Sequence, residues 1–218
     1  MPAKPDILLY ERKAWTSGFS LVAGVDEAGR GPLVGPVVAA AVVFDVGFLS
    51  AGVPDELLGL TDSKALTEKK RDHFFELLRG LDAVQIGVGV CSAEEIDRIN
   101  ILRATHKAMA LALDDLDVAA QFALVDGNPV QGLPCPSENI VKGDALSLSI
   151  SAASVIAKVT RDRMIYELDK LHPEYGFARH KGYGTAEHIA AIHEHGPLPC
   201  HRKTFRPISE LNQLDFGF

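Results

Sequence analysis

The sequence predicts an α/β fold in which a mixed β-sheet is flanked by helices. Three observations support this prediction. Short apolar runs have the periodicity of strands, amphipathic patterns that begin with capping residues indicate helices, and two apolar runs near the start of the chain are close enough to pair as a hairpin. A chain of 218 residues can bury one full core, so we expect a single compact unit.

The first part of the chain predicts one helix and two strands. Residues 6–15 can form a short helix, and the apolar run at residues 21–25 is predicted to be a buried strand. Residues 37–44 are β-branched and almost wholly apolar, which favours a central strand paired with the first one. Residues 47–59 are predicted to form a loop.

The middle of the chain alternates helical and strand patterns. Thr67 is predicted to cap a helix that runs to about Leu78, and alternating apolar residues predict a strand at residues 84–90. Ser92 opens a capping box, and one apolar stripe continues from it to about Asp117, so we expect a single long helix there.

The later elements follow the same logic. Strands are predicted at residues 122–125 and 140–142, and a loop with three prolines separates them. A long helix is expected from about residue 146 to residue 171. Thr185 is expected to cap a last helix that a Gly-Pro pair ends.

Charge is distributed unevenly along the chain. The net charge of −7 argues against a basic protein that coats nucleic acid. Residues 158–206, however, carry nine Lys or Arg against six Asp or Glu, together with six of the eight histidines. The mildly basic character of this part suits a polyanionic substrate, and the chain becomes glycine-rich and basic past residues 172–173.

Composition also sets expectations about the cellular setting. The mean hydropathy of +0.08 and the lack of a long apolar stretch argue against a membrane protein. Residues 1–6 lack the apolar centre of a signal peptide, so we expect a cytoplasmic protein, and a monomer. Cys91, Cys135 and Cys200 are widely spaced and are expected to be reduced thiols.

Four acids stand at or just beyond the ends of short apolar runs: Asp26, Glu27, Asp126 and Asp144. Strand ends lie side by side in a mixed sheet, so these carboxylates can converge although they are far apart in sequence. Bringing two like charges to about 5 Å costs roughly 3 kcal/mol at an effective dielectric constant of about 20. Either some of the acids are protonated or divalent cations neutralise them, and all-oxygen ligands favour Mg²⁺ or Mn²⁺ over zinc.

Simpler interpretations exist for parts of this pattern. Asp126-Gly127 taken alone is an ordinary turn dipeptide, whereas two adjacent acids after a core strand have no such role. The spacing of Gly24 and Gly29 matches a phosphate-binding loop, but Arg30-Gly31 replaces the Lys-Ser/Thr that must follow. His188 and its neighbours lack the spacing of a helical zinc site and are expected at the surface.

The stretch GVDEAGRGPLVGPV at residues 24–37 closely resembles the opening motif of bacterial ribonuclease HII. The resemblance continues in the family's order over nearly the whole chain. The further segments are LTDSK at 60–64, VDG at 125–127, KGD at 142–144, AASVIAKVTRD at 152–162, YGF at 175–177, HKGYGT at 180–185 and HR at 201–202. Their combination is far more specific than any one of them.

The resemblance implies an endoribonuclease with an RNase H-like mixed sheet. Such an enzyme cleaves RNA in RNA–DNA hybrids and incises at single ribonucleotides embedded in duplex DNA. We accordingly predict a catalytic core at residues 1–172 and a small helical C-terminal region, which contacts substrate, at residues 173–218. The resemblance also implies that the four acids bind metal ions and catalyse. By the same resemblance, Gly29, Arg30 and Gly31 contact the ribose 2′-OH, Tyr183 lies at the RNA–DNA junction, and Lys64 lies near the substrate phosphates.

The residues and the resemblance agree on hydrolysis with two divalent ions, which leaves a 3′-hydroxyl and a 5′-phosphate. Candidates to line the duplex are Lys142, Lys158, Arg161, Arg179 and Lys181. Two alternatives stay open: another metal-dependent nuclease or resolvase on the same fold, and a non-catalytic hybrid-binding module with a structural ion. The sequence indicates no particular protein partner.

Three of these side chains also have purely structural interpretations. Arg30 can pair with a neighbouring acid, which is compatible with substrate contact in turn. Tyr183 can pack on the helix that follows it. Arg161 and Asp162 can form a helical ion pair of little energetic consequence.

Overall fold

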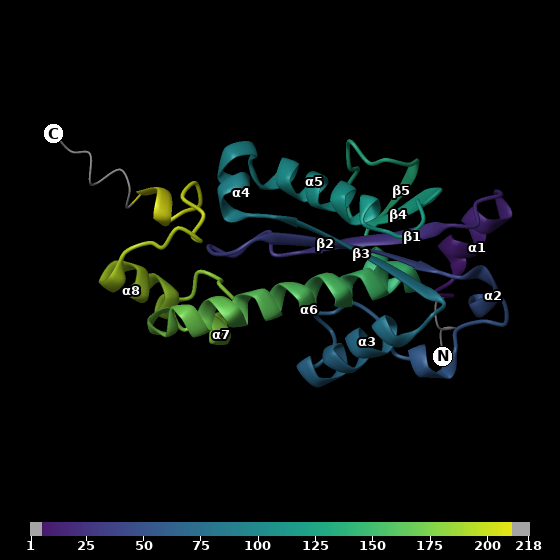
Figure 1. Ribbon diagram of the computed structural model, residues 1–218, viewed down its shortest axis with the longest axis horizontal. Helices are drawn as coiled ribbons and strands as arrows, with labels where there is room; N and C mark the ends of the chain where they lie inside the picture. Colours follow the sequence, from purple (N-terminus) through teal and green to yellow (C-terminus); the bar gives the residue numbers. More distant parts are fainter. Residues whose placement is uncertain (1–5, 211–218) are drawn as a thin grey trace.

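The structure, a computed structural model, describes residues 6–210 and contains the predicted mixed sheet (Figure 1). Five strands lie in the order β3-β2-β1-β4-β5. β1 pairs antiparallel with β2 and parallel with β4, while β2 pairs antiparallel with β3 and β4 pairs parallel with β5. The strand bounds are Val22–Ala28 (β1), Val37–Phe44 (β2), Val84–Cys91 (β3), Phe122–Asp126 (β4) and Ser137–Ile140 (β5).

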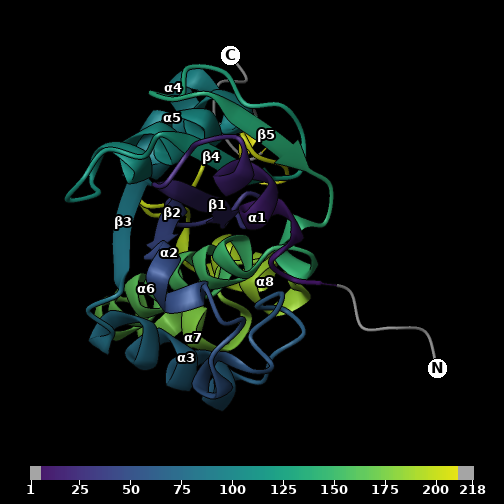
Figure 2. The same cartoon turned by 90° about the vertical axis from the view of Figure 1, so that its right-hand side faces the viewer.

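Helices cover both faces of this sheet (Figure 2). α4 and α5 lie on one face, and α3 and α6 lie on the other, with an apolar core on each side. The helix bounds are Leu9–Thr16 (α1), Val46–Leu49 (α2), Glu68–Gly80 (α3), Ala93–Ile99 (α4), Ile101–Asp114 (α5), Leu148–Leu171 (α6), Phe177–His180 (α7) and Ala186–His195 (α8). The 3₁₀ turns are Asp55–Leu57 (η1), Gly143–Ala145 (η2) and Pro173–Tyr175 (η3).

The two helices that pack most closely on the sheet do so at glycines. A Cβ at Gly24 of β1 would lie 2.1 Å from the backbone of Ser149 in α6. A Cβ at Gly89 of β3 would lie 1.9 Å from the carbonyl oxygen of Ala108 in α5. Both distances are far below van der Waals contact, so only glycine fits at these positions. The first contact fixes α6 against the strand that carries two of the candidate acids.

The first strand is longer than predicted. Its pairing with β2 extends to the Ala28–Val38 pair, so Asp26 and Glu27 lie inside the strand and not after its end. Because side chains alternate along a strand, these two adjacent acids face opposite sides of the sheet.

Two predictions in helical regions are wrong. The single helix expected over residues 92–117 is divided into α4 and α5 at Asn100, whose φ is 68° and whose side chain caps α5 by accepting a backbone N–H at 3.1 Å. The loop expected at residues 47–59 contains α2 and η1, because Asp45 accepts the Phe48 N–H at 3.1 Å and caps a short helix. In both places the side chain of one polar residue caps a helix and so decides where that helix begins.

The last strand of the sheet also differs from the prediction. The strand expected at residues 140–142 lies earlier, because Lys142 adopts a left-handed φ of 59° and the chain leaves the sheet there. The long helix α6 then begins two residues later than expected and ends where predicted. Three predicted caps are confirmed by side-chain oxygens that accept an N–H of the first helical turn, at Thr67, Ser92 and Thr185.

The C-terminal elements close one end of the sheet. α7 and α8 lie at the end of the molecule opposite α1 and α2 (Figure 1). An apolar cluster joins Leu33 and Val34, in the loop after β1, to side chains of η3, α7 and α8. Over residues 173–210 the predicted C-terminal region thus packs on the core, and residues 211–218 lie outside the described residues.

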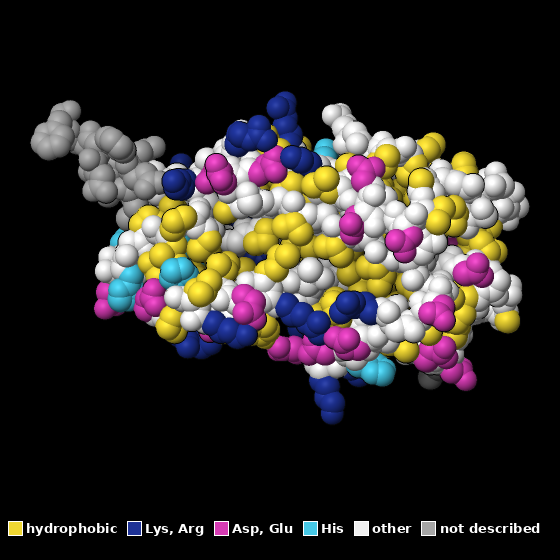
Figure 3. All heavy atoms as spheres, in the orientation of Figure 1, with side chains coloured by type: hydrophobic (Ala, Val, Ile, Leu, Met, Phe, Trp, Pro, Cys, Tyr) yellow, Lys and Arg dark blue, Asp and Glu magenta, His cyan; other side chains and the backbone are white. Residues whose placement is uncertain are grey.

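The sheet edge formed by β3 reaches the surface. Val90 is exposed, and Figure 3 shows hydrophobic side chains in a band between the helices of the two faces on this side. Lys and Arg side chains lie above and below this band and do not gather in one patch. Across residues 6–210, no helix has both the length and the apolar character needed to cross a membrane. The three cysteines are free thiols, as predicted.

Candidate active site

The sheet brings three of the four predicted acids together. Asp26 lies on β1, Asp126 ends β4, and Asp144 lies in η2. One carboxylate oxygen from each lies within 4.8 Å of the others. β1 and β4 are parallel and pair Val25 with Val125, so the residues that follow, Asp26 and Asp126, come side by side. We call these three side chains the carboxylate centre.

Asp144 reaches the centre through a turn that hydrogen bonds hold in place. The Gly143 N–H donates to Oδ1 of Asp126 at 2.7 Å. The Ser151 hydroxyl of α6 donates to the carbonyl oxygen of Asp144 at 2.8 Å. The position of Asp144 therefore depends on β4 and on α6, which are distant from each other in sequence.

The crowding of like charges perturbs these acids. Burial, and then the charges of Glu27 and Asp126, raise the pKa of Asp26 well above its usual value. Burial, and then the charge of Asp126, raise the pKa of Asp144 to about 6. A centre that disfavours its own negative charge is one that a bound cation would stabilise.

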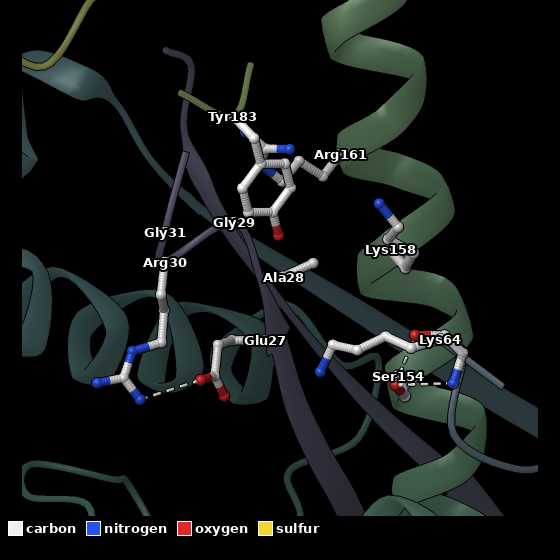
Figure 4. Close-up of a pocket in the computed structure, with 11 residues that line it drawn as sticks. Glu27, Ala28, Gly29, Arg30, Gly31, Lys64, Ser154, Lys158, Arg161 and Tyr183 are labelled. Atoms are coloured by element: carbon white, nitrogen blue, oxygen red, sulfur yellow. Dashed lines mark hydrogen bonds and ion pairs between the residues drawn. The ribbon is translucent and has the colours of Figure 1, made fainter. Parts of the chain in front are cut away.

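Glu27 lies beside the centre and faces the other side of the sheet. Its carboxylate is outside the group of three oxygens within 4.8 Å of one another, and its Oε1 lies 3.3 Å from Nη1 of Arg30 (Figure 4). The predicted pairing of Arg30 with a neighbouring acid is therefore confirmed. Burial raises the pKa of Glu27 although Arg30 opposes this, and the charge of Asp126 raises it further. Glu27 thus remains within electrostatic reach of the centre.

Lys64 approaches the centre from the loop before α3. Its partial burial alone would lower its pKa, but the charges of Asp26, Asp62 and Asp144 raise it. Its amine points into the cavity shown in Figure 4. Asp62 was not singled out from the sequence, although it lies in the LTDSK segment. After burial and Asp126, its charge is the next cause that raises the pKa of Asp144.

Two buried serines join the Lys64 segment to α6. The Ser154 hydroxyl donates to Oγ of Ser63 at 2.9 Å, and the Ser63 N–H donates to Ser154 at 3.4 Å. The side chain of Ser154 also lies near Asp26 and lowers the pKa of that acid against the larger effect of burial. Neither serine was assigned to the site from the sequence. Ser154 is one of several small residues of α6 that indicate close packing equally well, and Ser63 lies in the LTDSK segment without a role of its own.

The residues predicted to contact substrate line one cavity of about 210 Å³ next to the centre (Figure 4). Gly29, Arg30 and Gly31 form one wall, Tyr183 stands beside them, and Lys64 lies across from them. The Tyr183 side chain is 46% exposed and its hydroxyl points into the cavity. A Cβ at Gly31 would be 3.4 Å from the tyrosine ring, so the ring adjoins the glycine loop. Packing on the following helix is therefore not the main environment of this ring.

A second cavity of about 280 Å³ lies on the other side of the Glu27–Arg30 pair. Asp126, Asn128 and His106 are among the residues that line it. Burial, and then the charge of Arg30, lower the pKa of His106. Space next to the carboxylate centre is thus available on both sides of the ion pair.

The basic residues predicted to line the duplex have different environments. Lys142 and Arg179 are exposed, and Lys158 lines the first cavity, where it pairs with Asp162 at 2.8 Å. The predicted helical pair of Arg161 with Asp162 is wrong. Arg161 is buried, and its guanidinium donates to backbone carbonyls instead.

His188 is buried, contrary to the expectation of a surface position. Its ring stacks on His180 with 4.5 Å between centroids, and its Nε2 lies 3.1 Å from Nε2 of His201. His193 and His195 on the same helix are exposed, as expected. The difference arises because one face of α8 packs against the apolar cluster that η3 and α7 also join. The spacing of the histidines in the sequence does not indicate which face that is.

Comparisons with known proteins agree with one another. The family model described as Ribonuclease HII matches residues 23–208. The chain is 53% identical over 207 residues to ribonuclease HII of Geobacter metallireducens, which covers 92% of this chain and 93% of the relative. The solved structure of ribonuclease H2 from Pyrococcus horikoshii OT3 has a TM-score of 0.71 and 29% identity, over 89% of this chain and 98% of that one. Ribonuclease HII in the PCNA complex from Archaeoglobus fulgidus has a TM-score of 0.67 and 27% identity, over 85% and 95%.

Proposed function

This chain belongs to the ribonuclease HII family and is an endoribonuclease that hydrolyses the RNA of RNA–DNA hybrids, and we propose that its carboxylate centre is the catalytic site. The proposed catalytic and metal-binding residues are Asp26, Glu27, Asp126 and Asp144. One observation carries the proposal. Three of these carboxylates converge within 4.8 Å beside the cavity that holds the glycine loop and the exposed tyrosine.

Divalent ions fit the donor set of this centre. The atoms that it offers are carboxylate oxygens, which Mg²⁺ and Mn²⁺ prefer, and the raised pKa of Asp26 reflects crowded negative charge that a cation would neutralise. Asp26, Asp126 and Asp144 would hold two ions together with Glu27, which lies beside them. Bound there, the ions would activate a water molecule and stabilise the leaving 3′-oxygen, so that a 3′-hydroxyl and a 5′-phosphate result.

Side chains around the cavity would hold the substrate strand. Lys64 and Arg30 present positive charge where phosphate groups must lie for their ester bond to reach the centre. The loop of Gly29, Arg30 and Gly31 can approach the ribose closely, since glycine has no Cβ, and the φ of 100° at Gly29 is one that glycine adopts freely. Tyr183 would stack on the neighbouring sugar at the RNA–DNA junction.

Duplex DNA with a single ribonucleotide is a second proposed substrate besides continuous hybrids. The 2′-OH is the group that distinguishes RNA from DNA at a given position. The residues proposed to contact it surround one small cavity, so recognition needs one ribose and no run of ribonucleotides.

The proposal extends to the division of labour along the chain and to its setting. Residues 1–172 would carry the chemistry, and residues 173–218 would contribute Tyr183 and contacts to the duplex. We propose a monomer that acts in the cytoplasm. The complex of the Archaeoglobus fulgidus relative with PCNA makes a PCNA-type protein the first partner to assay, by size-exclusion chromatography of mixtures.

A cleavage assay on three duplexes of one sequence tests the proposed function. The duplexes are all DNA, a continuous RNA–DNA hybrid, and DNA with one ribonucleotide. With Mg²⁺ or Mn²⁺ we expect the second and third to be cut, with a 3′-hydroxyl and a 5′-phosphate at the mapped bond, and we expect chelator to abolish cutting. Cleavage of the all-DNA duplex, or cleavage that chelator leaves unchanged, would contradict the proposal.

A further inference from the structure

Arg202 is a buried arginine whose side-chain hydrogen bonds go to backbone carbonyls of the glycine loop. Its Nη2 donates to the Gly29 carbonyl at 2.6 Å, its Nη1 to the Arg30 carbonyl at 2.9 Å, and its Nε to the Gly35 carbonyl at 3.0 Å. Burial, and then the charge of Arg161, lower the pKa of Arg202 to about 9, so its guanidinium is still charged at neutral pH. A buried cation is costly, and here three carbonyl oxygens compensate it.

These bonds set the direction of two peptide groups. In a trans peptide, the C=O and the N–H of one plane point in opposite directions. Because the carbonyls of Gly29 and Arg30 point at Arg202, the N–H groups of Arg30 and Gly31 point away from it, on the side of the loop that lines the cavity. Neither N–H has a backbone acceptor among residues 6–210, so both are available to a ligand oxygen.

Further hydrogen bonds hold the rest of the loop. Arg161 donates to the carbonyls of Val34 and Pro36, both at 3.1 Å. The backbone N–H of Arg202 donates to the Leu33 carbonyl at 2.8 Å. The loop thus has little freedom to turn its carbonyls outward while these contacts persist.

His201, the neighbour of Arg202, begins a chain of hydrogen bonds that ends at Tyr183. The Leu198 N–H donates to Nδ1 of His201 at 2.9 Å, which assigns the ring proton to Nε2, and this Nε2–H donates to Nε2 of His188 at 3.1 Å. His188 is then protonated on Nδ1 and donates to the Tyr183 carbonyl at 2.9 Å. Burial lowers the pKa of both rings, that of His201 to about 4. Both rings are therefore neutral at neutral pH, and the hydrogen bonds between them persist.

We propose that His201-Arg202 is a positioning dipeptide for recognition of the ribonucleotide. Arg202 aims the amides of Arg30 and Gly31 at the ribose, and His201, through His188, holds the backbone of Tyr183 at the same cavity. One dipeptide thereby couples the two walls that contact the sugar. The inference rests on the proposed function of the cavity. It predicts that a variant with a more mobile glycine loop binds the duplex normally but recognises the ribose 2′-OH less well.

The first test is Arg202→Lys, which keeps the charge but cannot reach three carbonyls at once. On a duplex with one ribonucleotide we expect kcat to fall at least about tenfold while KM changes little. In the free protein, ¹⁵N relaxation should show increased mobility of the Arg30 and Gly31 amides. Two control variants should change neither readout: Arg206→Lys, an exposed arginine of the same region, and Ile192→Ala, a core deletion in α8 that lowers only Tm.

The second test addresses the histidine chain independently. His188→Phe keeps an aromatic ring in the cluster but removes the donor to the Tyr183 carbonyl. We expect a loss of about 3- to 10-fold in cleavage at a single ribonucleotide, and no further loss when it is combined with Tyr183→Ala, because both changes act through one contact. His193→Phe, on the exposed face of α8, is the matched control and should be neutral.

Several outcomes would overturn the inference. Ile192→Ala could lose as much kcat and loop order as Arg202→Lys, or the losses of His188→Phe and Tyr183→Ala could add. If Arg202→Lys does not fold, Arg202→Gln takes its place with the same expected result, since it retains a donor without a buried charge. A wild-type chain that leaves single ribonucleotides uncut would overturn the proposed function instead, so the two failures are distinguishable.

Discussion

Two polar clusters near the substrate cavity differ in what they leave unsatisfied. The carboxylate centre gathers like charges, and burial raises the pKa of Asp26 and Asp144. The His188–His201–Arg202 cluster also buries polar groups, but each ring nitrogen and each guanidinium nitrogen in it has a hydrogen-bond partner. A bound cation would stabilise the first cluster, whereas the second is complete without a ligand.

This difference separates chemistry from positioning. A cluster that repels itself lowers the free energy of unfolding, and binding of a cation restores it, which is typical of a reactive centre. A satisfied polar network resists rearrangement and can hold a neighbouring loop in one geometry. If the distinction is right, substitutions in the two clusters should affect activity and stability in different proportions.

The largest expected effect is the loss of cleavage in Asp126→Asn. A neutral amide is a poor ligand for a divalent ion, so we expect kcat/KM on a hybrid to fall about 10³-fold, or roughly 4 kcal/mol of transition-state stabilisation. Hybrid binding and Tm should persist, because one like charge leaves the centre. Asp82→Asn, an exposed acid after α3, should remain active. Unfolding of Asp126→Asn in thermal denaturation, or wild-type cleavage, would break the comparison.

Mg²⁺ should stabilise the protein, and more so at pH 8 than at pH 5.5. A metal concentration about 100 times Kd contributes about 2.7 kcal/mol, which corresponds to a rise in Tm of roughly 5–11 °C for a chain of this size. The rise should shrink at the lower pH because Asp144, with a pKa of about 6, must lose its proton to bind. Thermal denaturation with and without Mg²⁺ measures it, and an equal rise in Asp126→Asn would contradict the assignment.

Tyr183→Ala should weaken cutting at an isolated ribonucleotide by about tenfold, the expected worth of one stacking contact. The loss in a long hybrid should be smaller, since neighbouring ribonucleotides offer alternative registers. Tyr183→Phe keeps the ring and should retain most activity on both substrates. Parallel kinetics on the two duplexes check this, and equal losses in Tyr183→Ala would count against a role at the junction.

The smallest expected effect concerns stability against pH in the absence of metal. Asp144 binds its proton more tightly when folded, with a pKa of about 6 against 3.8, so its contribution to stability falls as pH rises from about 4 to 6. His201 binds its proton less tightly when folded, with a pKa of about 4 against 6.5, so its contribution rises from about pH 4 to 6.5.

Asp144→Asn should remove the first of these opposed trends. The Tm of the metal-free variant should therefore climb more steeply between pH 4.5 and 6.5 than the Tm of the wild type, by roughly 2–4 °C. Thermal melts across this range measure the slope. A slope no steeper than that of the wild type would show that the two clusters do not oppose each other.

Much of the fold was predictable because strand alternation and helix caps are local signals. The apolar run at β2 and the caps at Thr67 and Thr185 depend on residues close in sequence, and the structure confirms them. The break between α4 and α5 was missed because the apolar stripe continues across Asn100 while the backbone turns there. The only local sign of the break is Asn100, whose side chain caps α5.

The sequence predicted which residues belong to the candidate site, but it did not predict how they are arranged. Asp26, Asp126 and Asp144 were expected to converge, and they do. Glu27 was expected to join them, but it follows Asp26 within a strand and faces the opposite side of the sheet. Arg202 was quoted in the HR segment without a role, because a basic residue has the same local pattern whether it lies on the surface or inside.

The sequence by itself determined the order of the strands along the chain, the acids available for metal binding and the family to which they point, since each depends on residue type and short spacing. Only the tertiary structure decided which acids meet, that Asp62 approaches Asp144, and that His201-Arg202 holds the glycine loop and Tyr183. The physical reason is that these contacts depend on the register of parallel strands and on helices packed across the sheet. Such contacts join residues that are far apart in sequence, and the sequence around one residue does not indicate which distant residue it will meet.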